Sequence, residues 1–263
     1  MIPNVLSIAG SDPSGGAGIQ ADLKTFAALG AYGMAAITAL TAQNTQGVTG
    51  VHELPPDFVA KQVETVFDDI RVDAVKIGMA GSGSTITQLG DVLQKRKPSI
   101  IILDPVMVAQ SGDVLLSDEA AGRLKIALLP LASVITPNIP EAEILLEKKF
   151  DGDMEYFAKQ ILKLGARAVL LKGGHLKGET AKDVFADSKQ MITLEERRVK
   201  TKHNHGTGCT LSSALAVYMA KGLPVDEAAR AAKRYVTGAL RKAEKLKVGH
   251  GAGPLHHFHT LWK

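Results

Sequence analysis

Ile100-Ile101-Ile102-Leu103-Asp104 is the stretch of this sequence that decides the fold. A continuous apolar run of this kind predicts a strand in a sheet that is covered on both faces, as parallel sheets between helices are. An aspartate follows at the point where the strand would end. Because ligands bind outside the carboxyl ends of the strands in such sheets, we expect the functional site at this edge.

Strand patterns alternate with amphipathic helical patterns along most of the chain. Strands are expected at 5–9, 33–41, 74–77, 99–103, 133–136, 168–172, 183–186 and 190–193, with helical patterns at 19–26, 59–70, 86–93, 124–128 and from 210 onward. Expected helix boundaries are Pro56 in a first turn, Ser84 and Ser117 as N-caps, and Gly30 as a C-terminal stop. The alternation predicts an α/β protein with a mostly parallel central sheet in a single domain, 1–263.

Composition excludes several classes of function. The 263 residues are 45% hydrophobic, which is enough for a sizeable core, and the net charge is only +4. No long basic block and only 5% aromatic residues argue against a nucleic-acid surface. One cysteine indicates a reducing compartment, and no apolar run is long enough to span a bilayer. We therefore expect a cytoplasmic protein without nucleic-acid or membrane partners.

The first expected strand leads into a glycine-rich turn. Gly16, Gly18 and Ala21 satisfy the dinucleotide-binding pattern G-x-G-x-x-A. The acidic residue that would bind a ribose should follow about 20 residues later, yet none occurs between residues 22 and 53, and the first arginine is Arg71. A phosphate-binding loop of the G-K-[ST] type is excluded as well, since the chain has no Gly-Lys pair. We reject an oxidoreductase.

A second glycine-rich turn, HGTGCT (205–210), precedes a helical run. Unpaired N–H groups at a helix start, together with the helix dipole, favour a phosphate, so Gly206, Thr207 and Gly208 are candidate catalytic residues. Cys209 lies on the same first turn, where a lowered thiol pKa is expected. An anion site beside a proton acceptor indicates phosphoryl transfer to a small alcohol. The alternative is a tight loop at Gly208 with Cys209 as a buried apolar residue.

Oxygen-bearing side chains follow two further expected strands. Asp104 could hold Mg²⁺, directly or through water, and Asn138 with Glu141 adds oxygens for a hydrated Mg²⁺ and its phosphates. Alternatively, Asn138 caps a helix and Glu141 occupies the third helical position, as in a capping box.

Two more strand ends carry candidate ligand-binding residues. At the end of the second strand, the amide of Gln43 offers a donor and an acceptor suited to the edge of an aminopyrimidine, although an ordinary solvated loop residue is the alternative. Lys172 can meet a phosphate, and Gly173 allows a nucleotide to approach closely.

These segments together resemble the hydroxymethylpyrimidine/phosphomethylpyrimidine kinases of thiamine biosynthesis, in the ribokinase-like superfamily. The segments that carry the resemblance are AGSDPSGGAGIQAD (9–22), TAQNT (41–45), VKIGM (75–79), DPVMV (104–108), TPN (136–138) with Glu141, KGGH (172–175) and HGTGCT (205–210). They span nearly the whole chain. Two departures are Ala80, where the family commonly has leucine, and the tail 249–254, to which we assign no role.

The resemblance implies a three-layer α/β/α ribokinase-like fold, a homodimer, and ATP-dependent phosphorylation of 4-amino-5-hydroxymethyl-2-methylpyrimidine and then of its monophosphate. The implied site residues are Cys209 as catalytic base; Gln43, Gly10, Met79 and Val106 for the pyrimidine; Asp104 and Glu141 for Mg²⁺; and Lys172, Gly173, Asn138 and Thr207 for ATP.

Two alternatives stay open at this point: a pyridoxal/pyridoxine kinase on the same scaffold, and an inactive ligand-binding sensor, although a sensor has no need of a catalytic base. His256, His257 and His259 are interpreted as an exposed helix end rather than a metal site.

Overall fold

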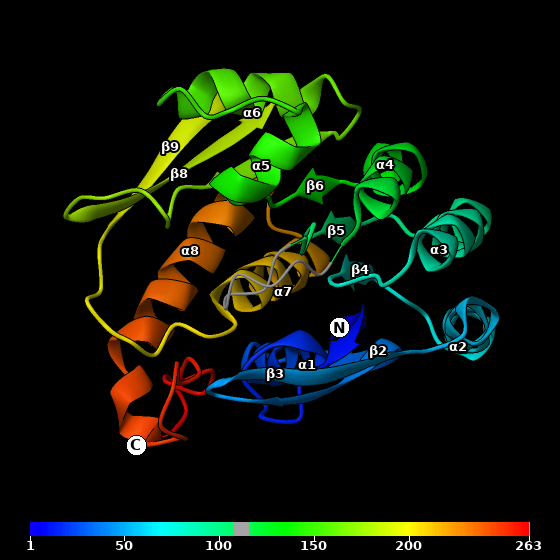
Figure 1. Ribbon diagram of the computed structural model, residues 1–263, viewed down its shortest axis with the longest axis horizontal. Coiled ribbons are helices and arrows are strands. Elements are labelled where there is room, and N and C mark those ends of the chain that lie inside the picture. Colours follow the sequence, from blue (N-terminus) through cyan, green and yellow to red (C-terminus); the bar gives the residue numbers. More distant parts are fainter. Residues whose placement is uncertain (108–115, 263) are drawn as a thin grey trace.

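The computed structural model describes residues 1–107 and 116–262 (Figure 1). Val108, the last residue of the DPVMV segment, lies outside them. Within the described residues, one nine-stranded sheet has the strand order β3-β2-β1-β4-β5-β6-β7-β8-β9. The strands are β1 (Asn4–Ser11), β2 (Tyr32–Asn44), β3 (Gly47–Glu53), β4 (Ala74–Ile77), β5 (Ile101–Leu103), β6 (Val134–Ile135), β7 (Ala168–Lys172), β8 (Thr180–Asp187) and β9 (Met191–Arg197).

The centre of the sheet is parallel, as expected. The neighbouring strands β2-β1-β4-β5-β6-β7 all pair in parallel. β3 pairs antiparallel with β2, and β8 pairs antiparallel with both β7 and β9. Ile101, Ile102 and Leu103 form β5, and all three are buried, whereas Ile100 precedes the strand and is half-buried. Because the parallel strands share one direction, their carboxyl ends lie along a single edge.

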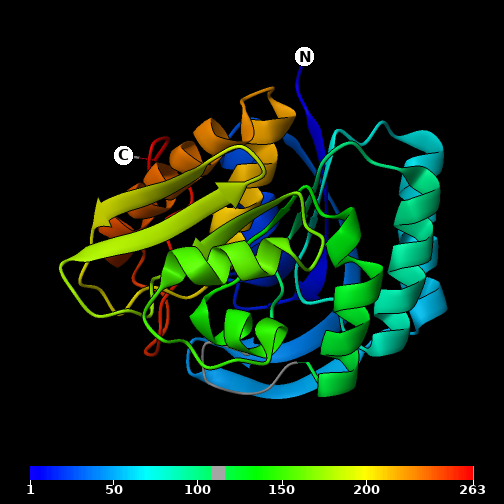
Figure 2. The ribbon, with the colours of Figure 1, turned by 90° about the horizontal axis from the view of Figure 1, so that it is seen from above.

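Helices cover both faces of this sheet (Figure 2). One face packs against α2 (Pro56–Asp69), α3 (Gly83–Arg96), α4 (Asp118–Ala127), α5 (Ile139–Leu146) and α6 (Met154–Leu162), and the other against α1 (Gly18–Ala28), α7 (Thr207–Ala220) and α8 (Val225–Arg241). Side chains of β5 alternate between the two cores: Ile101 and Leu103 enter the first, and Ile102 enters the second. Period-2 alternation with both faces apolar confirms the three-layer α/β/α architecture.

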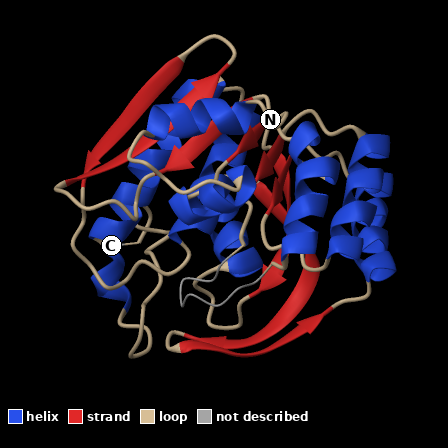
Figure 3. Cartoon of the chain, turned by 45° about the horizontal axis from the view of Figure 1, so that its top comes forward, coloured by secondary structure: helices blue, strands red, loops and turns tan. Residues whose placement is uncertain are grey.

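The structure corrects some expected boundaries. β3 was not expected, because none of its residues is buried; it pairs with β2 as a long curved ribbon at the sheet edge (Figure 3). The N-cap of α3 is Ser82 rather than Ser84, since the Ser82 hydroxyl accepts the Thr85 N–H. Ser117 caps α4 and α2 begins at Pro56, as predicted.

Residues 249–257, here called the strap, return from the end of α8 to the rest of the fold. The N–H of Ala252 donates to the Thr45 carbonyl at 2.9 Å, and the N–H of His205 donates to the Gly253 carbonyl at 3.1 Å. His257 Nε2 lies 3.1 Å from the Thr210 hydroxyl on α7. The strap therefore joins the end of β2 to the start of α7.

The interpretation of the three C-terminal histidines as an exposed helix end is wrong. His256, His257 and His259 are all buried. The strap and the residues after it pack against α7 and α8: His257 lies against Thr210 of α7, and the ring of His259 lies against that of Tyr235 of α8. The Tyr235 hydroxyl, from α8, donates to the His257 carbonyl at 2.6 Å. Among the helices of the described residues, none is long and apolar enough to cross a membrane.

Candidate active site

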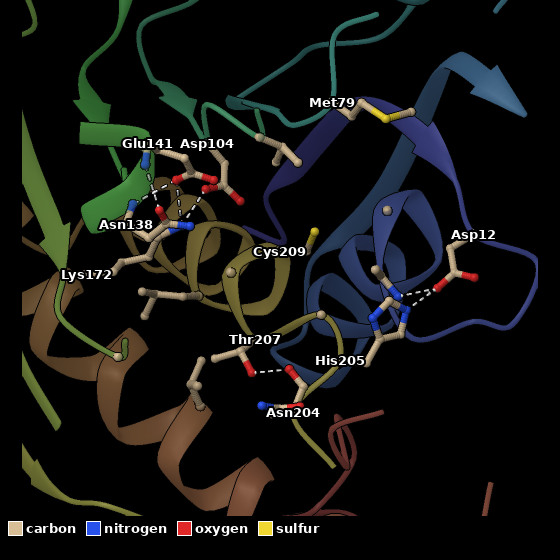
Figure 4. A pocket seen from close by; sticks show the side chains of 18 of the residues that line it. Asp12, Met79, Asp104, Asn138, Glu141, Lys172, Asn204, His205, Thr207 and Cys209 are labelled. Atoms are coloured by element: carbon tan, nitrogen blue, oxygen red, sulfur yellow. Dashed lines mark hydrogen bonds and ion pairs between the residues drawn. The ribbon is translucent and has the colours of Figure 1, made fainter. Parts of the chain in front are cut away.

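A cavity of about 630 Å³ opens at the carboxyl ends of the parallel strands (Figure 4). Every predicted site residue except Gly173 lines it: Gly10, Gln43, Met79, Asp104, Val106, Asn138, Glu141, Lys172, Gly206, Thr207, Gly208 and Cys209. These residues come from both halves of the chain. The volume is in the range of ordinary small-molecule sites.

The second glycine-rich turn opens a helix, as predicted. α7 begins at Thr207, and its N-cap, Gly206, has a φ of 81°, a left-handed conformation that favours glycine. A Cβ at Gly206 would overlap the carbonyl oxygen of Gly16, so the two glycine-rich turns are in backbone contact. A Cβ at Gly208 would lie 3.3 Å from the Lys172 Nζ. The same Cβ would lie 3.6 Å from Asp104 Oδ2, so the first turn of α7 faces the Lys172–Asp104 ion pair.

Cys209 is partly accessible, and the backbone N–H of Gly18 faces its sulfur. The expectation of a lowered thiol pKa is wrong. Burial, together with the charges of Asp22 and Asp104, raises the pKa of Cys209 to about 11, although Lys76 and the Gly18 N–H act in the opposite direction. The thiol is therefore protonated near neutral pH.

Asp104, after β5, is the centre of a buried polar cluster. Its Oδ1 accepts hydrogen bonds from Lys172 Nζ at 2.8 Å and from the Thr136 hydroxyl at 3.0 Å, and its Oδ2 accepts one from the Ser212 hydroxyl at 3.2 Å. Burial opposes ionisation, but the charges of Lys172 and Lys76 hold the pKa of Asp104 below its ordinary value. Asp104 is thus an anion, paired with a lysine.

Asn138 and Glu141 form the capping box that was the alternative interpretation. The Glu141 N–H donates to Asn138 Oδ1 at 2.9 Å, and the Asn138 N–H donates to Glu141 Oε2 at 2.7 Å. Both residues also line the cavity, so capping and ligand binding are compatible here. Burial and the charge of Asp104 raise the pKa of Glu141 to about 7, even though Lys172 favours its ionised form.

The carboxylates of Asp104 and Glu141 fit a hydrated Mg²⁺. Mg²⁺ usually keeps several waters and binds proteins through one or two carboxylates together with substrate phosphates. Both side chains share Lys172, whose Nζ lies 3.8 Å from Glu141 Oε2. Contact through water leaves these ion pairs in place, whereas direct coordination would compete with the lysine.

The opposite end of the cavity holds Gln43. Its Nε2 lies 3.4 Å from His205 Nε2, and its Oε1 lies 3.2 Å from the Thr41 hydroxyl. His205 Nε2 lies 2.8 Å from Asp12 Oδ2, which also accepts the N–H groups of Gly16 and Ala17. Burial opposes ionisation of Asp12, but these hydrogen bonds and the His205 charge lower its pKa to about 2.

Met79 and Val106 line the same cavity, together with Gly10. A Cβ at Gly10 would overlap the Met79 methyl group, so glycine lets the methionine lie over the end of β1. The Thr38 hydroxyl donates to the Met79 carbonyl at 2.6 Å and fixes the backbone there. Figure 4 shows Cys209 between the Asp104–Glu141–Lys172 cluster and the Asp12–His205 pair.

Gly173 contacts the sheet rather than the cavity. A Cβ there would overlap the Lys182 carbonyl oxygen, and its N–H donates to Asp183 Oδ1 at 3.0 Å. Asp183 in turn pairs with Lys233 at 2.6 Å, and both of these buried residues line the cavity. The close packing on β8 explains the glycine without a nucleotide.

Sequence reasoning gave no function to several cavity residues. Asp12, Lys76, Asp183, Arg198, His205 and Lys233 all line it. Asp12, Lys76 and His205 lie inside the segments that carry the family resemblance, which was the one available signal. The Asp12–His205 pair joins residues 193 positions apart, so no local pattern could predict it.

Comparison with known proteins shows the family of this chain. Residues 12–256 match the phosphomethylpyrimidine kinase family. The chain belongs to that family. A hydroxymethylpyrimidine/phosphomethylpyrimidine kinase of Rhizobium meliloti (strain 1021) is 51% identical over 261 residues, which are 98% of this chain and 98% of the relative. The resemblance inferred from the motifs is confirmed.

Solved structures of the family and of its neighbours share the fold. A phosphomethylpyrimidine kinase from Clostridium difficile 630 is 47% identical, with a TM-score of 0.81, and the match covers 90% of this chain and 99% of that one. A pyridoxal kinase from Staphylococcus aureus in complex with AMP-PCP and pyridoxal is 35% identical, with a TM-score of 0.90, over 99% of this chain and 95% of that one. The ribokinase-like fold expected from the sequence is confirmed.

Proposed function

We propose that this protein is a kinase that uses ATP and Mg²⁺ to phosphorylate 4-amino-5-hydroxymethyl-2-methylpyrimidine, and then the monophosphate to the diphosphate. The observation that carries the proposal is the position of Cys209. It lies at the start of α7, between Gln43 at one end of the cavity and the Lys172–Asp104 pair at the other. The names of the relatives support the same reaction.

The chemistry follows from these positions. The hydroxymethyl oxygen attacks the γ-phosphorus of ATP, the new O–P bond forms, and the bond from the γ-phosphorus to the bridging oxygen breaks to release ADP. Cys209 takes the hydroxyl proton. The N–H groups at the start of α7 face the charge that develops on the transferred group, and Lys172 adds positive charge on the same side.

The phosphate end of the cavity holds the groups that a metal nucleotide requires. Asp104 and Glu141 would hold Mg²⁺ through water, and the ion would neutralise phosphate charge as ATP reacts. Asn138, Lys172 and Thr207 would contact the nucleotide. The Thr207 hydroxyl donates to the Asn204 carbonyl at 2.6 Å, which leaves its oxygen lone pairs to accept a further bond.

Gln43 is the proposed specificity residue. Its amide can accept from the exocyclic amine of a 4-aminopyrimidine and donate to a ring nitrogen, a pairing that pyridoxal does not offer. A site built for such hydrogen bonds penalises a mismatched analogue, because its own polar groups are left unpaired. Gly10, Met79 and Val106 would form the apolar walls around the ring.

A product assay with ATP and Mg²⁺ tests the proposal. We expect a higher kcat/KM for the hydroxymethylpyrimidine than for pyridoxal or pyridoxine, and both mono- and diphosphate among the products. In Gln43→Leu, loss of the amide should weaken use of the pyrimidine by roughly 1–3 kcal/mol and reduce the preference. Equal use of pyridoxal by the wild type, or an unchanged preference in Gln43→Leu, would count against Gln43.

A pyridoxal kinase is the second candidate, favoured by the close structural match to the Staphylococcus aureus enzyme. The same assay separates the two activities, and no phosphorylated product from any of these alcohols would favour an inactive sensor. The homodimer and the cytoplasmic location stay predictions.

A further inference from the structure

Two contacts, one helical turn apart, join α1 to α7 beneath the cavity. The backbone N–H of Gly18, at the start of α1, faces the sulfur of Cys209 and favours its thiolate form. Four residues later on α1, Asp22 Oδ1 accepts a 2.7 Å hydrogen bond from Ser213, which lies four residues after Cys209 on α7. Since an α-helix repeats every 3.6 residues, Asp22 lies about one turn behind the thiol.

Lys76 belongs to the same cluster. From β4, its Nζ reaches both carboxylate oxygens of Asp22 at 2.9 Å, and the side chains of both residues are 0% exposed. The Ser7 hydroxyl adds a 2.6 Å hydrogen bond to Asp22 Oδ2. Lys76 lines the cavity as well. Burying an ion pair costs free energy unless hydrogen bonds satisfy both charged groups. Here Asp22 accepts hydrogen bonds from Lys76, Ser7 and Ser213, and these bonds hold the pair in one geometry.

The charged groups facing Cys209 come from four elements. Lys76 lies on β4 and Asp22 on α1. Asp104 directly follows β5, and Lys172 is the last residue of β7. Asp104 and Lys172 pair with each other at 2.8 Å in the phosphate end of the cavity. The pair behind the thiol therefore has no part in the proposed contacts with metal or nucleotide.

We propose that Lys76 is a positioning residue for the reaction: its buried ammonium, held in place by Asp22, stabilises the thiolate of Cys209, the form that can accept a proton. Asp22 has two opposite effects, since it fixes the ammonium but its own negative charge disfavours the thiolate. The catalytic consequence rests on the proposed function, whereas the effect on the thiol does not.

The test measures the thiol itself. The chain has one cysteine, so alkylation by uncharged iodoacetamide, followed by mass spectrometry at fixed alkaline pH, reports on Cys209 alone. Lys76→Met removes the ammonium and should slow alkylation by at least about threefold. Asp22→Asn removes the negative charge but keeps the shape, and should accelerate alkylation by at least about threefold. A purely structural role would change both rates in the same direction.

Lys233→Met is the matched control, because it removes the ammonium of a second buried ion pair, formed with Asp183 on β8. Its alkylation rate should equal that of the wild type. Changes of the same sign in Lys76→Met and Asp22→Asn, or no change, would overturn the proposal. If Lys76→Met does not fold, Asp22→Asn decides: faster alkylation supports the proposal, and an unchanged or slower rate overturns it. Full turnover in Cys209→Ala would instead refute the proposed base and leave the thiol result standing.

Discussion

Cys209 holds its proton near neutral pH, because burial and the charges of Asp22 and Asp104 outweigh Lys76 and raise its pKa to about 11. Only a small fraction of the free enzyme then carries the thiolate. Below the pKa, the thiolate fraction increases about tenfold for each unit by which the pH rises. We therefore expect the ionisation of Cys209, the proposed base, to make activity rise with pH in the same way above neutrality.

Replacement of Cys209 tests this dependence. Cys209→Ala should keep nucleotide binding and lose turnover by roughly 10²–10⁴-fold, the usual effect of removing a general base. Wild-type kcat/KM should rise as pH increases toward the thiol pKa. In Cys209→Asp, the carboxyl has a much lower intrinsic pKa than a thiol and meets the same burial and neighbouring charges, so activity should rise at lower pH than in the wild type. Steady-state kinetics over a pH series checks all three, and near wild-type turnover in Cys209→Ala would remove the thiol from the mechanism.

Glu141 provides a second pH dependence, this time in stability. Its pKa is about 7 in the folded protein, raised chiefly by burial, against an ordinary value of 4.5. Between these values the unfolded chain releases the proton and the folded chain keeps it, so the free energy of unfolding falls as pH rises. Above about pH 7 both states are ionised and the loss is complete.

Glu141→Gln isolates that effect, because the Gln carbonyl oxygen can still accept the Asn138 N–H of the capping box. We expect the stability of the wild type relative to the variant to decrease as pH rises from about 5 to 7, by at most about 1.4 kcal/mol per pH unit, and then to level off. Urea unfolding at each pH measures the difference. A difference that stays constant over this range would show that Glu141 titrates normally.

At the scale of elements, the start of α7 depends on the turn before it. Gly206 combines a left-handed backbone with contact to Gly16, and this brings the first turn of α7 against the first glycine-rich turn. The helix start could be predicted from its glycines and threonine. Its partner could not, because backbone contact between segments about 190 residues apart leaves no local pattern.

Gly206→Ala should be strongly destabilising and should abolish turnover, since its methyl group would displace the Gly16 backbone. Gly222 is the matched control: it has a φ of 91° at the end of the same helix, and an added Cβ would meet nothing within 4 Å. Gly222→Ala should cost only the left-handed backbone penalty, about 1–2 kcal/mol, with normal turnover. Urea unfolding and kinetics compare the two, and equal effects would exclude the contact as the cause.

At the scale of the whole molecule, the regular pattern of apolar strands and amphipathic helices was enough to predict the layers and the edge that carries the site. The parallel core follows from this pattern, as β5 shows. The edge strand β3 could not be predicted, because none of its residues is buried and its sequence therefore shows no alternation of buried apolar residues. Two ion pairs, Lys76–Asp22 and Asp12–His205, could not be predicted for another reason. They form only when segments that are distant in the sequence pack together.

The strap has a consequence for biosynthesis. Residues 249–257 hold the loop that carries His205 and the first turn of α7, although they do not line the cavity themselves. They leave the ribosome after every residue that does line it. The sheet and most helices can form on the nascent chain. The strap can hold the His205 loop and the first turn of α7 in place only after residues 249–257 have been translated. A chain that stalls shortly before Gly249 would therefore be folded in most of its core and still lack a finished site.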